Sequence, residues 1–488
     1  MTSSGTVESI LGRWSDGPGP LHRKLTAALR EAIDHGHLAF GERLPSEREL
    51  AARLAVSRST VVTAYDALRT EGLLESRQGS GTRVRGGRRR RTEPVGAGGV
   101  PLSPVYRSLI SGSGGLISLA CAAFPAHPRV AEALADVTRE DSDKLFALTG
   151  YSPAGLPLLR ETIADMLTAD GTPTTPEQVL VTTGAQQAVH LSGMLLVRPG
   201  DDVVVESPSF AGTLDVFRTR GARLAAVPVD DDGADVGAIR DLVAARHPSA
   251  VYVMPSFHNP TGALMSVRRR EALASLATTE RVPVLEDNAL EQVALDDSER
   301  LPPIAAYGTD NAPILTTSSL SKSAWGGLRV GWLRGPIPLI TRLAELKAMT
   351  DLGSPLLDQA VAARLVPHLD EIRIDNCAAL CRNLELVSEL LAEQLPEWQW
   401  RRPRGGPSLW IRIPSGTAAA YAQVALRHGV EVIPGEIMSP SADHRDHMRV
   451  PFTAEPPVLE ETVRRLAAAW RDYSPRDEAR ETSRSVVV

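Results

Sequence analysis

Short apolar segments alternate with amphipathic stretches through most of the chain, from about residue 116 onward. The apolar segments are VLVTT, DVVVES, AVYVMPS, VPVLED and ILTTSS. This alternation is typical of an α/β domain whose mostly parallel sheet is covered by helices on both faces. From roughly residue 355, longer helical stretches precede WQWRRPRGGPSLWIRIP and VEVIP, which predict a smaller α+β part. We therefore predict a domain over 116–474, with a large part ending near 350, a small part over about 355–474, and a polar tail at 475–488.

A separate small domain is predicted over residues 15–84. Its first helix carries apolar residues at helical spacing, namely Leu21, Leu25, Leu29 and Ile33. Two further helices begin at the N-caps Ser46, with Glu49 three residues later as in a capping box, and Ser57. The segment LLESRQGSGTRV that follows predicts two short strands. Two capped helices a few residues apart, followed by such a hairpin, predict a winged helix-turn-helix.

The charges divide unevenly between these two parts. Residues 1–91 carry 16 Lys and Arg against 10 Asp and Glu, whereas the rest carries 37 against 49. A basic first segment on an acidic body indicates a polyanionic partner for the first segment only. The two domains are joined by a predicted linker over 85–115, which holds four consecutive arginines, Arg88 to Arg91. These arginines either follow DNA phosphates or form a solvated charge run.

Other features of the sequence exclude several classes of protein. No apolar run is long enough to span a bilayer, and the first residues do not resemble a secretion signal. The three cysteines, Cys121, Cys377 and Cys381, do not suffice for a disulfide framework, so we expect a cytoplasmic protein without a membrane partner. Cys377 and Cys381 share a predicted helix face, but the sequence predicts no metal site and favours a buried apolar role for them.

The second helix of the predicted motif opens with Ser57, Arg58, Ser59 and Thr60. Opening residues of this helix face base edges in the major groove, where the planar fork of an arginine can recognise guanine. The stretch 20–84 resembles the winged helix of GntR-type regulators, through GERLPSERELAARL, VSRSTVVTAYDALRTEGLL and the GSGT wing. The resemblance implies DNA contacts from Arg43, Arg48, Ser57, Arg58, Thr60 and Gly81, on a repeated double-stranded operator. Alternatives to DNA contact stay open for three residues. Ser46 is explained as a helix cap, and Gly79 and Gly81 are explained by a plain turn as well as by a close approach of the wing to the minor groove.

The segment TSSLSKSAWGGLRVGW combines residues suited to an aldehyde that carries a phosphate. Lys322 can form a Schiff base, and Ser319, Ser321 and Arg329 can bind the phosphate. Further candidates lie upstream: the strand-to-helix junction at Gly184, Ala185 and Gln186 for the phosphate, Asp287 for a pyridine nitrogen, Asn259 for a phenolic oxygen, and Phe210 for ring stacking. We therefore expect pyridoxal phosphate as the cofactor.

Residues 116–470 resemble the fold-type-I aminotransferases, with the motifs in the same order. By this resemblance, Tyr151 in YSPAGLPLLR reaches the cofactor phosphate of a neighbouring subunit, and Arg449 in HMRVPF holds a ligand carboxylate. The two resemblances in one chain look like the MocR subfamily of GntR regulators. Phe210 and Ala289 stand where the family usually has tyrosines, which argues against efficient transamination more than against cofactor binding.

The leading hypothesis is a transcription regulator that forms a head-to-tail homodimer and senses pyridoxal phosphate or an amine or amino acid effector. One alternative is an active aminotransferase with an appended DNA-binding domain. A third hypothesis is a plain repressor whose large domain only dimerises.

Overall fold

The predicted winged helix-turn-helix is present in the computed structural model, which describes residues 7–16, 19–77, 81–85, 110, 115–296 and 300–473. Its helices are α2 (Leu21–Asp34), α3 (Glu47–Arg53) and α4 (Arg58–Thr70), and its wing pairs β1 (Leu74–Arg77) with β2 (Gly81–Val84). Ser46 and Ser57 cap α3 and α4 by accepting hydrogen bonds from the backbone N–H groups of Glu49 and Thr60, each at 3.2 Å. The wing tip at 78–80, most of the predicted linker and the polar tail lie outside the described residues.

The core of this domain begins earlier than the predicted boundary at residue 15. A short helix, α1 (Val7–Leu11), precedes Trp14, and both pack into the same apolar cluster as α2 and α4. The residues at helical spacing in α4 are completely buried there: Val61, Ala64, Tyr65 and Leu68. Burying one large apolar side chain contributes roughly 1.5–3 kcal/mol, so this cluster is enough to define the small domain.

The large domain is built on an eight-stranded sheet in the order β4-β11-β10-β9-β8-β5-β6-β7. The five predicted strands are present as β4 (Val179–Thr182), β5 (Asp202–Ser207), β8 (Ala250–Val253), β9 (Val284–Asp287) and β10 (Ile314–Ser319). The central run from β10 to β6 is parallel, as predicted. Strand β11 (Gly331–Arg334) is antiparallel to both of its neighbours, so the sheet is mixed.

Three strands of this sheet are absent from the sequence-based prediction. Strand β11 has only two apolar residues, Trp332 and Leu333, between a glycine and an arginine. Strand β6 (Arg223–Asp230) has a proline within its apolar run, and β7 (Gly233–Ala234) has two residues. Because a proline or so short an apolar stretch weakens the sequence signal of a strand, tertiary pairing determines their conformation.

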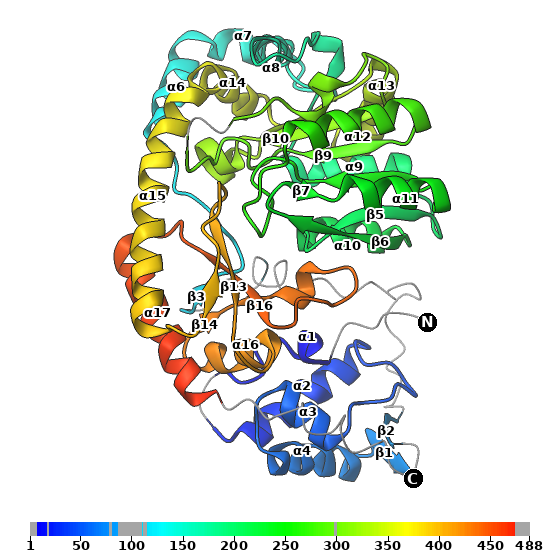
Figure 1. Ribbon diagram of the computed structural model, residues 1–488, viewed down its shortest axis with the longest axis vertical. Helices are drawn as coiled ribbons and strands as arrows, with labels where there is room; N and C mark the ends of the chain where they lie inside the picture. Colours follow the sequence, from blue (N-terminus) through cyan, green and yellow to red (C-terminus); the bar gives the residue numbers. More distant parts are fainter. Residues whose placement is uncertain are drawn as a thin grey trace.

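Helices cover both faces of the sheet (Figure 1), and the side chains of each strand alternate between these faces. Leu285 and Leu315 face a cluster that includes α9 (Ala185–Leu196), α10 (Ala211–Thr219) and α13 (Ile337–Asp351). Their neighbours Val284 and Ile314 face the opposite cluster, against α11 (Val236–Arg246) and α12 (Val267–Glu280). Adjacent residues of one strand therefore face different environments, which decides which polar side chains can meet at the strand ends.

A third cluster covers the β4 edge of the sheet. It joins α6 (Pro128–Glu140), α8 (Pro157–Ala169) and α14 (Leu356–Leu365), with α7 (Ser142–Phe146) after α6. Helix α14 lies within the predicted small part, which was expected to begin near residue 355. The packing places α14 beside the large sheet instead, because its apolar residues complete the cluster around Trp332 and Ile163.

The small part follows α14. The long helix α15 (Leu369–Gln394) runs along one side of the molecule from the large sheet to the small part (Figure 1). A four-stranded sheet combines β12 (Gln399–Trp400), β13 (Ser408–Arg412), β15 (Ile433–Pro434) and β16 (His447–Pro451), with helices α16 (Ala418–Arg427) and α17 (Pro456–Asp472). A separate parallel pair joins β14 (Val430–Glu431) to β3 (Ile117–Ser118). In the described part of the chain, no helix is long and apolar enough to cross a membrane.

Candidate cofactor site and DNA-binding face

A cluster of polar groups lies where β4 meets α9 and where β10 ends. Gly184 is the N-cap of α9, and Ala185 and Gln186 open the helix, so their N–H groups stand at its positive end. From the end of β10, the Ser319 hydroxyl donates to Ser321 Oγ at 2.9 Å. Arg329 donates to the same Ser321 Oγ at 3.5 Å, which brings the predicted phosphate ligands together.

Gly184 is required in this cluster for two reasons. Its φ is 110°, which L side chains rarely adopt, and a Cβ there would lie 3.1 Å from Arg329 Nη2. Arg329 also donates to the Thr183 carbonyl, so the guanidinium lies directly against the turn. The absence of a side chain at Gly184 therefore lets a cation approach the helix start, where an anion binds.

Lys322 lies in the short π-helix Ser321–Trp325 that follows β10. Its Nζ donates to the Ala122 carbonyl. Burial lowers the pKa of the Lys322 amine; Cys121 opposes this effect, while the positive charges of Arg449 and Arg329 lower it further. A lysine with a lowered pKa is more often neutral, which is the form that reacts with an aldehyde.

Asp287 ends β9 on the same face of the sheet as α9. Its carboxylate accepts hydrogen bonds from the Tyr252 hydroxyl at 2.8 Å and from the Ala289 N–H at 3.0 Å. The Thr213 hydroxyl in turn donates to the Tyr252 oxygen at 3.1 Å. Burial raises the pKa of Asp287, and the two hydrogen bonds to its carboxylate act in the opposite direction. A cationic pyridine nitrogen beside this carboxylate would also favour its ionised form.

Three further cofactor candidates, Phe210, Asn259 and Tyr151, are described by their burial and their position in the fold. Phe210 is the N-cap residue of α10 and is half-buried against the main core, and Asn259 is half-buried after β8. Tyr151 is 72% exposed at the surface between α7 and α8. That exposure suits a residue serving another subunit, and the role of Tyr151 stays a prediction.

Arg449 on β16 is buried, and its guanidinium faces the backbone just after β3. Its Nη2 donates to the carbonyls of Ala120, at 2.5 Å, and Leu119, at 3.3 Å. Burial lowers the pKa of Arg449 to about 10, partly offset by Cys121. Its Nε is buried without a hydrogen-bond partner in the described structure. A buried guanidinium with a donor to spare is suited to a carboxylate.

The predicted DNA-contacting residues lie on the winged helix, and most are exposed. The Arg58 side chain is 66% exposed at the start of α4 and lies 3.4 Å from a Glu47 carboxylate oxygen. Arg43 and Arg48 are exposed around the start of α3, whereas Thr60 and Gly81 are half-buried. The Arg43 guanidinium packs on Gly81, where a Cβ would lie 2.9 Å from Arg43 Nε. Ser57 caps α4 and Ser46 caps α3, so both serines act as the N-caps predicted from the sequence.

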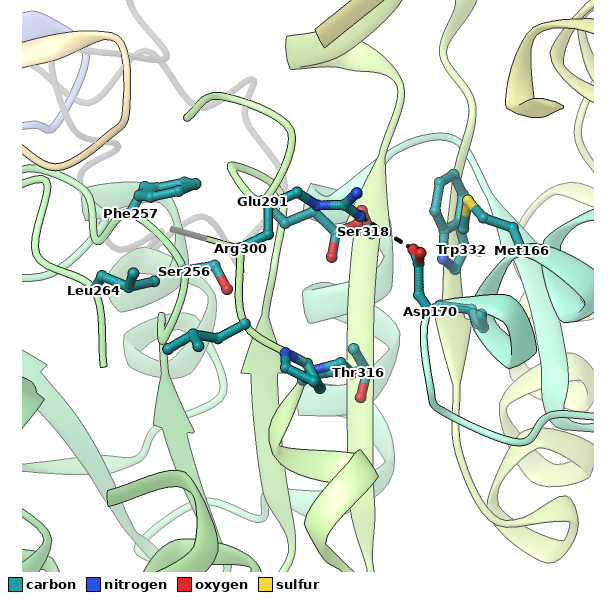
Figure 2. Close-up of a pocket in the computed structure, with 14 residues that line it drawn as sticks. Met166, Asp170, Ser256, Phe257, Leu264, Glu291, Arg300, Thr316, Ser318 and Trp332 are labelled. Atoms are coloured by element: carbon teal, nitrogen blue, oxygen red, sulfur yellow. Dashed lines mark hydrogen bonds and ion pairs between the residues drawn. The ribbon is translucent and has the colours of Figure 1, made fainter. Parts of the chain in front are cut away.

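The opposite face of β10 borders a separate cavity of about 220 Å³ (Figure 2). Ser318 points into it and donates to a Glu291 carboxylate oxygen at 2.6 Å. Arg300 pairs with Asp170 across the cavity at 3.1 Å. Burial raises the pKa of Glu291 to about 7, although Ser318 and Arg300 counteract it. No motif in the sequence points to Glu291.

Comparisons with known proteins place both domains. The family model for aminotransferase class I and II matches residues 118–467, and that for bacterial regulatory proteins of the gntR family matches 21–84. The chain is 31% identical to YisV, an HTH-type transcriptional regulator of Bacillus subtilis, over 89% of this chain and 92% of YisV. It is 30% identical to the probable rhizopine catabolism regulatory protein MocR of Rhizobium meliloti, over 72% of each chain. The chain belongs to the MocR subfamily of GntR-type regulators.

The aminotransferase-like part of this MocR-type protein also resembles solved enzymes. It matches the α-aminoadipate aminotransferase LysN of Thermus thermophilus with a TM-score of 0.67 and 28% identity, over 75% of this chain and 94% of LysN. The fold family is dependent on pyridoxal phosphate, and the residues present fit that group. The turn at Gly184 leaves room for a phosphate beside Arg329, Lys322 supplies an amine, and Asp287 supplies a buried carboxylate.

Sequence reasoning missed three residues around the cofactor site of this MocR-type protein. Tyr252 and Thr213 hold Asp287, and Ala122 accepts the hydrogen bond from Lys322. Tyr252 was visible as the one aromatic residue in the buried strand segment AVYVMPS, but nothing in the sequence pairs it with Asp287. Among the residues that the structure describes, no group of His, Cys, Asp or Glu is arranged to hold a metal ion.

Proposed function

We propose that this MocR-type regulator controls transcription in response to an amine or amino acid effector that binds at its pyridoxal phosphate site. The effector carries a carboxylate, which Arg449 holds, and an amine, which meets the cofactor near Lys322. The winged helix binds a double-stranded operator through the start of α4. A protein with this task acts where the DNA is, so we expect it in the cytoplasm.

One observation carries the proposal. The side chains of Arg449 and Lys322 both donate to carbonyls of a single short segment, Ala120 to Ala122. The carboxylate-binding group and the amine therefore approach the same short stretch of backbone. Their proximity suits a small molecule that has both an amine and a carboxylate.

The residues at this site would have distinct tasks. When bound, pyridoxal phosphate supplies an aldehyde that reacts with amines and a ring that accepts electrons. Ser319, Ser321 and Arg329, with the start of α9, would hold the phosphate. Asp287 would hold a proton on the ring nitrogen, and the Tyr252 hydroxyl orients its carboxylate. Lys322 would supply an amine to this aldehyde and would hold or release a proton at its Nζ.

We further propose that the protein acts as a homodimer. A surface beside the site exposes large apolar side chains, namely Phe146, Leu148, Tyr151, Leu158, Met349, Leu352 and Leu357. These residues come from two stretches, 146–158 and 349–357. The stretches are neighbours, because a Cβ on Gly353 would lie 2.8 Å from the Ser152 carbonyl oxygen. Exposed apolar patches of this kind mark interaction surfaces. A partner covering this patch would meet Tyr151, the residue predicted to reach the other subunit's cofactor.

The decisive experiment compares the wild-type protein with the K322A variant. We expect wild-type protein to absorb in the visible range with pyridoxal phosphate and to become irreversibly labelled on borohydride reduction, and we expect K322A to lose the labelling. Candidate amino acids are then tested for an effect on operator binding and for release of keto acid.

The outcomes separate the three hypotheses. Ligand-dependent operator binding that requires Lys322, without sustained keto acid release, supports the proposal. Sustained turnover would instead support an active aminotransferase with a DNA-binding domain; the full-length regulators among the relatives do not favour that hypothesis. Operator binding that no candidate ligand changes, in wild type or in K322A, would support a plain repressor whose large domain only dimerises.

A further inference from the structure

The backbone just after β3 receives both ligand-binding side chains. Arg449 donates to the carbonyls of Leu119 and Ala120, and Lys322 donates to the carbonyl of Ala122. A ligand carboxylate at Arg449 would compete for the donors that these carbonyls now hold, since a charged acceptor binds a guanidinium more strongly than a neutral one. Carboxylate binding would therefore act directly on this stretch of backbone.

The same backbone is tied to the small part through β14. The Leu119 N–H donates to the Glu431 carbonyl at 2.8 Å, in the parallel pairing of β3 with β14. The Ser118 hydroxyl donates to a Glu431 carboxylate oxygen. Because Glu431 is bonded through both its backbone and its side chain, a displacement of residues 118–120 is transmitted to β14.

Glu431 also faces the DNA-binding domain. Its carboxylate lies 3.7 Å from Arg13 Nη2, and the two side chains are only 13% and 22% exposed. Trp14, which follows Arg13 in the chain, belongs to the winged-helix core and donates its indole N–H to Gln423 of α16 at 3.1 Å. The segment before α2 therefore connects the small part to the core of the winged helix.

A second contact reaches the turn of the helix-turn-helix itself. Arg427, the last residue of α16, donates to the carbonyl of Ala55 at 3.1 Å and to that of Leu54 at 3.5 Å. Ala55 has a φ of 49° and lies between α3 and α4. These hydrogen bonds tie the turn that precedes α4 to the end of α16 in the small part.

We propose that Glu431 and Arg427 are positioning residues that couple a carboxylate at Arg449 to the orientation of α4. The ligand carboxylate releases the β3 backbone from Arg449, β3 and β14 shift together, and Glu431 and Arg427 carry the shift to the winged helix. The inference rests on the proposed function, since it requires a carboxylate ligand and an operator. The inference adds the residues through which carboxylate binding would affect operator binding.

The test measures coupling rather than either binding event alone. Full-length protein stripped of cofactor is titrated with N-(5'-phosphopyridoxyl)-L-leucine or with its decarboxylated counterpart, N-(5'-phosphopyridoxyl)-isoamylamine. Operator affinity is measured by fluorescence anisotropy on a duplex selected by this protein from a random library. The variants are E431Q, R13Q and R427Q. The control is R412Q, which removes an exposed ion pair with Asp446 on the same small part.

We expect the carboxylate adduct to change the wild-type operator Kd at least fivefold, and the decarboxylated adduct to change it less than twofold. In E431Q, R13Q and R427Q the response to the carboxylate adduct falls below twofold, while adduct affinity and adduct-free operator affinity stay within threefold of wild type. R412Q keeps the wild-type response. Melting temperatures verify that each variant is folded, and R13Q tests the Glu431 contact from its other side if E431Q is unstable.

Two results would overturn the inference: a full response in folded E431Q and R427Q, or an equal wild-type response to the two adducts. Failure of the proposed function would look different, because wild-type protein would then bind no adduct or no operator. Wild-type binding of both, with coupling that the variants retain, rejects only the route through Glu431 and Arg427.

Discussion

Replacing Glu291 by glutamine should make the protein more stable at alkaline pH and leave its stability nearly unchanged in acid. Glu291 borders the cavity behind β10 and accepts a hydrogen bond from Ser318, which a glutamine oxygen can also accept. Burial raises the pKa of Glu291 from the ordinary value of 4.5 to about 7. In the folded protein the carboxyl therefore holds its proton over a pH range in which the unfolded chain has already lost it.

The sign of the pH dependence follows from this difference. Stability falls with rising pH wherever the folded state binds more protons than the unfolded state, so the wild-type protein loses stability between about pH 4.5 and pH 7. Each pKa unit corresponds to about 1.4 kcal/mol, which gives a loss of about 3 kcal/mol above pH 7. Glutamine carries no charge and should avoid this loss. For a domain of this size, the difference corresponds to a rise in Tm of about 5 °C.

The assay is thermal unfolding of wild type, E291Q and the control E280Q at pH 5.0 and pH 8.5. Glu280 is the exposed last residue of α12, so E280Q makes the same change in charge without burial. We expect E291Q to exceed wild type at pH 8.5 by several degrees, with most of that gain absent at pH 5.0. An E291Q variant whose Tm follows wild type at both pH values would refute the assignment of a raised pKa to this buried carboxyl.

Three further predictions concern the cofactor site and the winged helix. Y252F removes the hydroxyl that donates to Asp287, so the pKa of Asp287 should rise further and cofactor affinity should fall about tenfold, measured by titrating apoprotein with pyridoxal phosphate. G184A places a Cβ against Arg329 at a positive φ, so it should weaken cofactor binding at least tenfold. The readout is the amount of pyridoxal phosphate that stays bound to the protein through gel filtration. R58A should weaken operator binding by about 1–3 kcal/mol and relax base preference at one position, checked by anisotropy on single-base operator variants.

The sequence predicted those parts of the fold that are specified by neighbouring residues. The five strands with continuous apolar runs and the two capped helices are present, because burial and capping act over a few residues. The apolar residues of α14 pack in the cluster beside the large sheet, although they are compatible with either part of the large domain. Only its packing against α6 and α8 decides between them.

In the candidate site too, residues that share one motif could be predicted from the sequence, whereas contacts between distant segments could not. Lys322, Ser319, Ser321 and Arg329 stand within one short motif, and hydrogen bonds join Ser319, Ser321 and Arg329. The partners of Asp287 come from a different strand and from α10, so strand order had to be known first. The pairing of β3 with β14 joins residues more than 300 positions apart, and no local pattern in IS or VE predicts it.

The helix α15 has a mechanical consequence for any rearrangement in this protein. It is 26 residues long and extends from the large sheet to the small part, so at 1.5 Å per residue it measures about 39 Å. A rigid rod of that length converts a rotation of about 5° at one end into a displacement of roughly 3 Å at the other. That displacement exceeds the tolerance of a hydrogen bond, so a rotation too small to disturb the core around α15 would be enough to break or exchange contacts at its far end.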